Sequence, residues 1–234
     1  MEFKTDLYGY DSLAFFGRVN ASISHELKNI MAIISETAGL LNDLSEMAGT
    51  GTAIEPDMLI SSTDSIIEEI QRGFTTIRQM NRFSHSVDTP AGAVDLMEML
   101  DLIRHLCGYL SYAGKLNLNP GGGDAPIVHT SPFALQAVVY QAVVRAFQEA
   151  DSEAELDISI QSGDDSTWRI LVEGFSAKAF DAFHDDRIKS MAASIGLSIQ
   201  WDPAADRLEM GVPVSIENFG SGSRSRELPA VRNQ

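Results

Sequence analysis

The residue of this sequence best suited to chemistry is a histidine, His25, in the stretch Ser24-His25-Glu26-Leu27-Lys28-Asn29. An imidazole exposed to water is mostly uncharged at neutral pH and can then act as a nucleophile. Asn29 follows His25 by four residues, which places it on the same face of a helix, and Glu26 flanks the histidine. The three side chains are therefore candidates for a nucleophilic site. The alternative is a solvated helix surface without chemistry.

A long helix must position these residues. From residue 11 to about residue 46 the sequence has neither proline nor a turn cluster, and its apolar residues recur at steps of three, four or seven. At about 100° per residue, one arc of about 60° contains Ile23, Leu27, Ile30 and Ile34. His25 lies about 200° from Ile23 on the same wheel. The expected helix therefore turns His25 away from its apolar seam.

A second helix is expected after the break at Gly49-Thr50-Gly51-Thr52, because Glu55-Pro56-Asp57 places proline where a first helical turn favours it. This helix ends near residue 83, and its apolar stripe consists of Leu59, Ile66, Ile70, Phe74 and Ile77. Two antiparallel helices of this kind expose more apolar surface than one pair can bury. We therefore expect residues 1–88 to form an all-α helical hairpin that pairs with a second copy, as a four-helix bundle in a homodimer.

A second domain is expected over residues 89–214, after a linker at Thr89-Pro90-Ala91-Gly92. Helical spacing covers residues 95–113, 132–150 and 185–194, and strand patterns cover residues 115–119, 127–129, 156–161, 168–173, 197–201 and 207–212. Helices that are segregated from a small, largely antiparallel or mixed sheet indicate an α+β fold. Residues 215–234 are rich in Gly, Ser and Arg, and we expect this tail to be disordered.

The composition excludes several classes of protein. The chain has 234 residues, with 17 Lys and Arg against 33 Asp and Glu, and its net charge of −16 repels phosphate backbones and anionic lipid surfaces. Its single cysteine, Cys107, cannot form an internal disulfide, which fits a reducing compartment. The sequence shows no signal peptide and no run of apolar residues long enough to span a membrane. We expect a cytoplasmic protein with neither nucleic acid nor membrane as a partner.

The stretch around His25 resembles the phosphoacceptor box of the two-component histidine kinases, which lies in the first helix of a dimerisation hairpin. The resemblance implies that His25 accepts a phosphoryl group on a ring nitrogen and that Glu26 is the acid/base neighbour of the imidazole. It also implies that Asn29 positions a water molecule for dephosphorylation. One residue departs from the family pattern, since Ile30 replaces the proline that usually follows this box. The helix is therefore expected to be straighter there.

In the order of its elements, the second domain resembles a shortened form of the ATP-binding, Bergerat-like domain of the same kinases. That family holds magnesium and nucleotide with a helix asparagine, a strand-end aspartate with glycines, and a glycine-rich lid. Here Arg145 stands where the asparagine would be, and a guanidinium cannot ligate a cation. The strand end reads Glu173-Gly174-Phe175, and residues 177–194 contain no glycine. We therefore expect this chain to bind no ATP, no magnesium and no other cofactor or metal.

These patterns predict a histidine phosphotransferase of a two-component phosphorelay, in which His25 carries a phosphoryl group between the aspartates of response-regulator receiver domains. The magnesium is expected on the partner receiver. Two alternatives remain open: a divergent but active sensor histidine kinase, and a non-catalytic pseudokinase adaptor that binds a response regulator. Elsewhere, His105 and Cys107 lie two residues apart on a helix and cannot converge on one metal ion, so both are expected to pack in the core or at its boundary.

Overall fold

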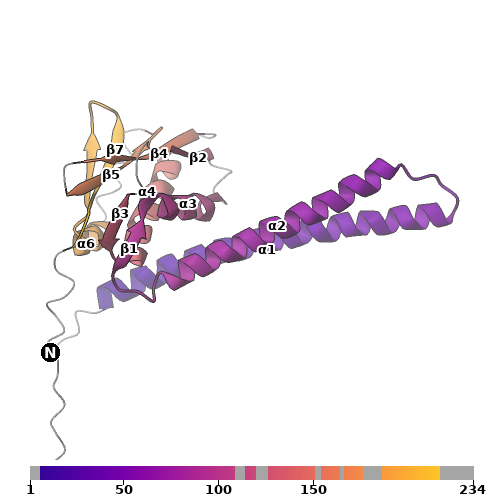
Figure 1. Ribbon diagram of the computed structural model, residues 1–234, viewed down its shortest axis with the longest axis horizontal. Coiled ribbons are helices and arrows are strands. Elements are labelled where there is room, and N and C mark those ends of the chain that lie inside the picture. The colour runs from indigo at the N-terminus through magenta and orange to yellow at the C-terminus, as the bar shows by residue number, and fades with distance from the viewer. Residues whose placement is uncertain are drawn as a thin grey trace, which may run out of the picture.

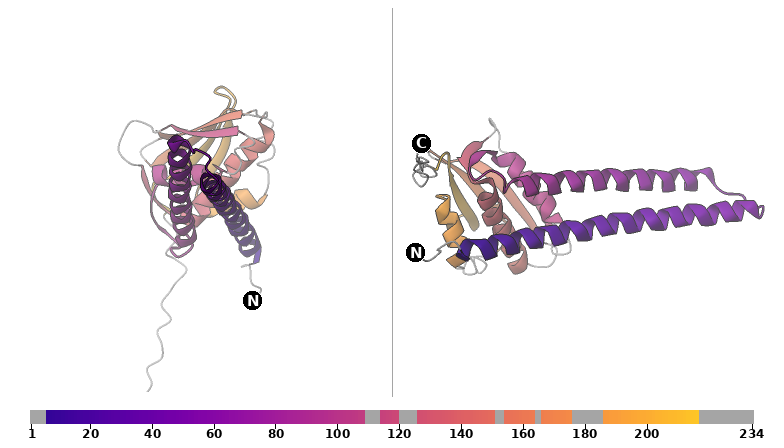
Figure 2. Two further views of the ribbon diagram at one scale, coloured as in Figure 1. Left: turned by 90° about the vertical axis from the view of Figure 1, so that its right-hand side faces the viewer. Right: turned by 90° about the horizontal axis from the view of Figure 1, so that it is seen from below.

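The protein consists of a long helical hairpin and an α/β domain packed over one end of it (Figure 1). The computed structural model describes residues 6–108, 114–119, 126–150, 154–163, 166–175 and 186–216. The far end of the hairpin, where its two helices are joined, extends well beyond the domain (Figure 2). The expected helical hairpin followed by an α+β domain is confirmed.

The hairpin is formed by α1 (Asp6–Gly49) and α2 (Pro56–His85). Pro56 occupies the first turn of α2, where its missing N–H costs no hydrogen bond. The connection contains Gly51 with φ of 92°, a left-handed conformation that glycine adopts without strain. Between the two helices, the fully buried Ile30 lies against Gly73. The position that the family pattern gives to proline is therefore part of the helix–helix seam within one chain.

The first turns of α1 are anchored to the second domain by aromatic side chains. Phe15 is fully buried, and its ring centroid lies 5.4 Å from that of Phe83 on α2. On the other side of Phe15, the rings of Phe133 and Tyr140 lie at centroid distances of 5.4 and 5.2 Å. The last two residues belong to a helix of the second domain, α4 (Pro132–Glu149). This cluster brings α1 into the common core about three turns before His25.

The second domain is built on a five-stranded mixed sheet of order β2-β4-β5-β7-β6. Its strands are β2 (Gly114–Asn119), β4 (Ala154–Ser162), β5 (Thr167–Glu173), β6 (Ser198–Asp202) and β7 (Arg207–Pro213). β2 and β4 are parallel, and the other neighbours are antiparallel. The apolar side chains of the sheet share one core with α4 and with two further helices, α3 (Leu96–Leu106) and α6 (Asp186–Ser194). α3 lies between the sheet and the hairpin (Figure 1).

The structure differs from the sequence-based expectation in two small elements. Part of the expected linker is a strand, β1 (Gly92–Asp95), which pairs antiparallel with β3 (Ile127–Thr130). The expected tail also begins with ordered residues, since the N–H of Ile216 donates to the carbonyl of His129 at 3.2 Å. Both pairings join segments far apart in the chain, which local patterns do not reveal. Residues 217–234 and the triple glycine at 121–123 lie outside the described residues.

Candidate functional site

His25 lies exposed on α1, on the part of the hairpin that passes under the second domain. Its ring nitrogen Nδ1 is 3.3 Å from the amide Nδ2 of Asn29, one helical turn further on. Nδ1 is thus the ring nitrogen that faces Asn29, and Nε2 has no hydrogen bond to a described residue. The structure brings together two of the predicted site residues, and it leaves one imidazole nitrogen open to a reactant.

The third predicted residue, Glu26, forms an ion pair across the hairpin with Arg72 of α2. Arg72 also lies 3.2 Å from Glu69, one turn earlier on its own helix. Partial burial alone would lower the pKa of Arg72, but the hydrogen bonds and negative charges of Glu26 and Glu69 outweigh it and raise that pKa. Arg72 is therefore a permanent cation beside His25. Sequence reasoning missed it, because the pairing spans 46 residues of sequence.

A cavity of about 540 Å³ opens beside His25. This volume lies within the range of small-molecule sites, which is about 300–1,000 Å³. Side chains of α1, α2 and the C-terminal end of α3 line it, namely Ser22, Ile23, His25, Glu26, Asn29, Arg72, Thr75, Thr76, Gln79, Arg104, His105 and Leu106. The cavity therefore joins all three predicted site residues to the second domain.

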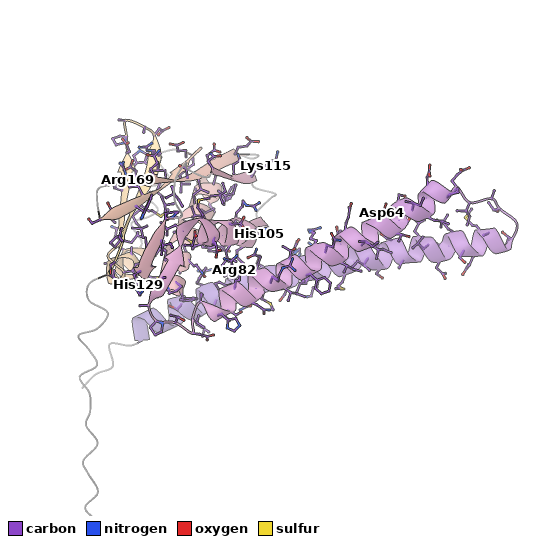
Figure 3. The ribbon with its side chains drawn as sticks, viewed as in Figure 1. Asp64, Arg82, His105, Lys115, His129 and Arg169 are labelled. Carbon is purple, nitrogen blue, oxygen red and sulfur yellow. The ribbon has the colours of Figure 1, made fainter. Side chains whose placement is uncertain are left out.

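The placement of His105 differs from the expectation that it packs in the core or at its boundary. It is exposed in the last turn of α3 (Figure 3), and it lines the cavity beside His25. Cys107, in contrast, is buried, and burial raises the pKa of its thiol. On a helix, residues two apart point about 200° from each other, so the burial of Cys107 turns His105 outward. If Cys107 is taken as buried, helical spacing alone predicts that His105 points outward.

At the end of β5, where the sequence resembles a nucleotide site, Gly174 and Phe175 make contacts that support the fold. Phe175 is buried and packs edge-to-face on Trp201, with ring centroids 5.3 Å apart. A Cβ on Gly174 would clash with the carbonyl oxygen of Glu155, and the φ of Gly174 is 98°. This glycine is therefore required by the backbone of the strand end itself. Arg145 lies half-buried on α4.

Neither a metal cluster nor a membrane span is present in the part of the chain that the structure describes. Within those residues, no three His, Cys, Asp or Glu side chains gather closely enough to ligate a metal ion. None of the described helices combines the length and the apolar character that crossing a bilayer requires.

The fold is similar to several solved structures at low sequence identity. The catalytic domain of histidine kinase ThkA matches 55% of this chain and 100% of its own at 12% identity and a TM-score of 0.46. Histidine kinase AdeS of Acinetobacter baumannii covers 83% of this chain and 98% of its own, at 12% identity and a TM-score of 0.44. A bacterial phosphotransferase covers 85% of this chain and 95% of its own, at 11% identity and a TM-score of 0.44. No family model and no curated protein matches the sequence.

Proposed function

We propose that the protein is a histidine phosphotransferase, which carries a phosphoryl group on His25 between the aspartates of response-regulator receiver domains. The observation that carries this proposal is the open imidazole nitrogen of His25 beside a cavity that Glu26, Asn29 and Arg72 also line. The resemblance of the stretch from Ser24 to Asn29 to a phosphoacceptor box supports the same chemistry.

In the proposed reaction, the lone pair of His25 Nε2 attacks the phosphorus of a receiver's aspartyl phosphate. The new N–P bond forms as the P–O bond to the aspartate breaks, and the aspartate leaves as a carboxylate. Attack from Nε2 requires the ring proton to sit on Nδ1, and the side-chain oxygen of Asn29 can accept that proton's hydrogen bond once its amide rotates. Phosphoryl transfer needs mostly positioning and charge stabilisation, and the partner receiver would supply the magnesium.

The second domain is proposed to bind neither ATP nor magnesium. Phe175 fills space against Trp201, and Gly174 is needed by the backbone of its own strand end. Arg145 would add a positive charge where the related kinases hold a metal ion. The phosphoryl group must then reach His25 from another protein.

The source of the phosphoryl group can be tested directly. Incubation with receiver domains charged by labelled acetyl phosphate is expected to label His25, whereas labelled ATP with magnesium leaves the protein unlabelled. Phosphohistidine is lost in acid and stable in base, so acid treatment of the gel identifies the linkage. Label from ATP above trace stoichiometry would show a kinase instead. A protein that binds receivers and takes up no label from any donor would show an adaptor.

Glu26→Gln is expected to slow transfer to His25 without abolishing it, because it removes the carboxylate proposed to act as acid/base neighbour. The loss of one such group costs a factor of about 10² to 10⁴ in rate. Glu69→Gln is the matched control, since Glu69 also pairs with Arg72 but does not line the cavity. Single-turnover rates of transfer distinguish the two roles. Equal rates in the two variants would show that Glu26 contributes only through its ion pair with Arg72.

We also propose that the hairpin forms a homodimer. One side of α2 carries exposed apolar side chains, namely Leu59, Ile67, Ile70, Phe74 and Ile77. On α1, Met31 is exposed as well. Exposed apolar side chains repeated along one side of a hairpin helix are typical of an interface between copies.

A further inference from the structure

We propose that Arg104 and His105 of α3 contact the phosphoryl group while it is on His25, so that the second domain supplies part of the phosphotransfer site. This inference rests on the proposed function and adds two residues from outside the phosphoacceptor hairpin. Both residues line the cavity that His25, Asn29 and Arg72 line from the opposite side. The domain would thus act on the phosphoryl group without binding a nucleotide.

The charge of the cavity wall supports an anionic occupant. Arg72 and Arg104 line the cavity together with a single carboxylate, that of Glu26. The cavity lining thus contains more cationic than anionic side chains, although the whole chain has a net charge of −16. Arg72 is engaged by Glu26 and Glu69, whereas Arg104 is engaged by Asp101 alone among the described residues. Arg104, which is paired with one carboxylate, is therefore the less neutralised of the two guanidinium groups beside His25.

The contacts of Arg104 hold its guanidinium and still leave a donor group free. Its Nε and Nη2 both donate to Oδ1 of Asp101, one turn earlier on α3, at 3.2 and 2.7 Å. Nη1 has no hydrogen bond to a described residue. A planar guanidinium that is oriented by one carboxylate is suited to donate its remaining N–H groups to phosphoryl oxygens.

His105 is oriented in a similar way. Its Nδ1 lies 2.8 Å from the backbone carbonyl oxygen of Asp101, and a carbonyl can only accept, so the ring proton sits on Nδ1. Nε2 is then the atom left for a ligand. It can accept a hydrogen bond from a protonated phosphoryl oxygen or, when protonated itself, donate to an ionised one. The carboxylate of Asp101 also lies 3.5 Å from Nδ1.

Transfer kinetics test the contribution of Arg104. With a receiver that phosphorylates the unmodified protein, Arg104→Gln is expected to lower the maximal single-turnover rate about 10²-fold, as when one preorganised donor is removed from a reacting oxyanion. The receiver concentration at half-maximal rate is expected to stay unchanged, because the contact is to the phosphoryl group. Lys115→Gln is the matched control: it removes the same charge from an exposed position on β2 that does not line the cavity.

A spectroscopic signature separates contact from structural damage. The protein can be phosphorylated by potassium phosphoramidate, and its phosphohistidine ³¹P resonance is then recorded in the unmodified protein and in three variants. Arg104→Gln and His105→Ala are expected to move this resonance, and Lys115→Gln to leave it in place. Circular dichroism melts confirm that the variants fold.

The possible outcomes distinguish this inference from the proposed function. If the unmodified protein takes phosphate from neither receivers nor phosphoramidate, the proposed function itself fails. If it does take phosphate, and Arg104→Gln and His105→Ala match Lys115→Gln in maximal rate and ³¹P resonance, the inference is overturned while the proposed function stands. A change only in the half-maximal receiver concentration would assign Arg104 to receiver docking, and would overturn it as well.

Discussion

His25→Ala is expected to abolish the transfer of labelled phosphate from receiver domains to this protein. The variant removes the exposed imidazole whose Nε2 has no hydrogen bond to a described residue, and neither Glu26 nor Asn29 provides a nucleophile that forms a stable phosphoramidate. The loss should be complete in a single-turnover assay and should not depend on the receiver concentration.

His85→Ala provides the matched control for this variant. His85 is also an exposed imidazole of the hairpin, but its Nδ1 lies 2.8 Å from Asp88, and it does not line the cavity. This control should transfer phosphate at the unmodified rate. If His25→Ala still takes up label, the assignment of the phosphoacceptor is wrong, and mapping the labelled peptide would show whether His105 accepts the group instead.

Two aspartate substitutions on the hairpin are expected to have different effects, one on the stability of the fold and the other on dimerisation. Ile30 is fully buried against Gly73 within one chain, so Ile30→Asp places an unpaired carboxylate in that seam and should destabilise the fold by several kcal/mol. Phe74 is 59% exposed in the single chain, so Phe74→Asp should leave the helices intact and separate the dimer. Thermal melts measure the first effect, and light scattering measures the mass of the second variant.

The control for the dimer is Ile127→Asp, at a position on β3 that is 56% exposed and outside the hairpin. This variant should keep the mass of the unmodified protein. A Phe74→Asp variant of unchanged mass would show that the exposed apolar side of α2 is not the interface. A stable Ile30→Asp variant would contradict the helix–helix seam.

The position of His25 could be predicted because helical periodicity is a local property. Counting at about 100° per residue from Ile23 was sufficient to turn the imidazole outward. The same count could not assign the partners of the two apolar stripes. Ile30 lies against Gly73 in the seam of its own hairpin, whereas Phe74 of the second stripe is left exposed.

The parts of the site that sequence reasoning missed depend on contacts between distant segments. The ion pair of Glu26 with Arg72 forms only when the two helices of the hairpin come together. The residues next to each of them in the sequence do not indicate that the two pair. The approach of Arg104 and His105 to His25 depends on how the whole second domain sits on the hairpin. β1 was missed for a related reason, because four residues next to a proline gain strand character only by pairing with β3.

The aromatic cluster around Phe15 limits how this protein can be divided. Phe15 and Phe83 come from the hairpin, and Phe133 and Tyr140 come from the second domain, and all four rings meet in one core. A hairpin cut away from its domain would lose the contacts of Phe15 and Phe83 with the rings of the second domain and expose apolar surface to water. The two helices of the hairpin are therefore not a separable unit. A hairpin that is duplicated or grafted alone would need new packing partners for Phe15 and Phe83. We therefore expect His25 and the second domain to be retained together.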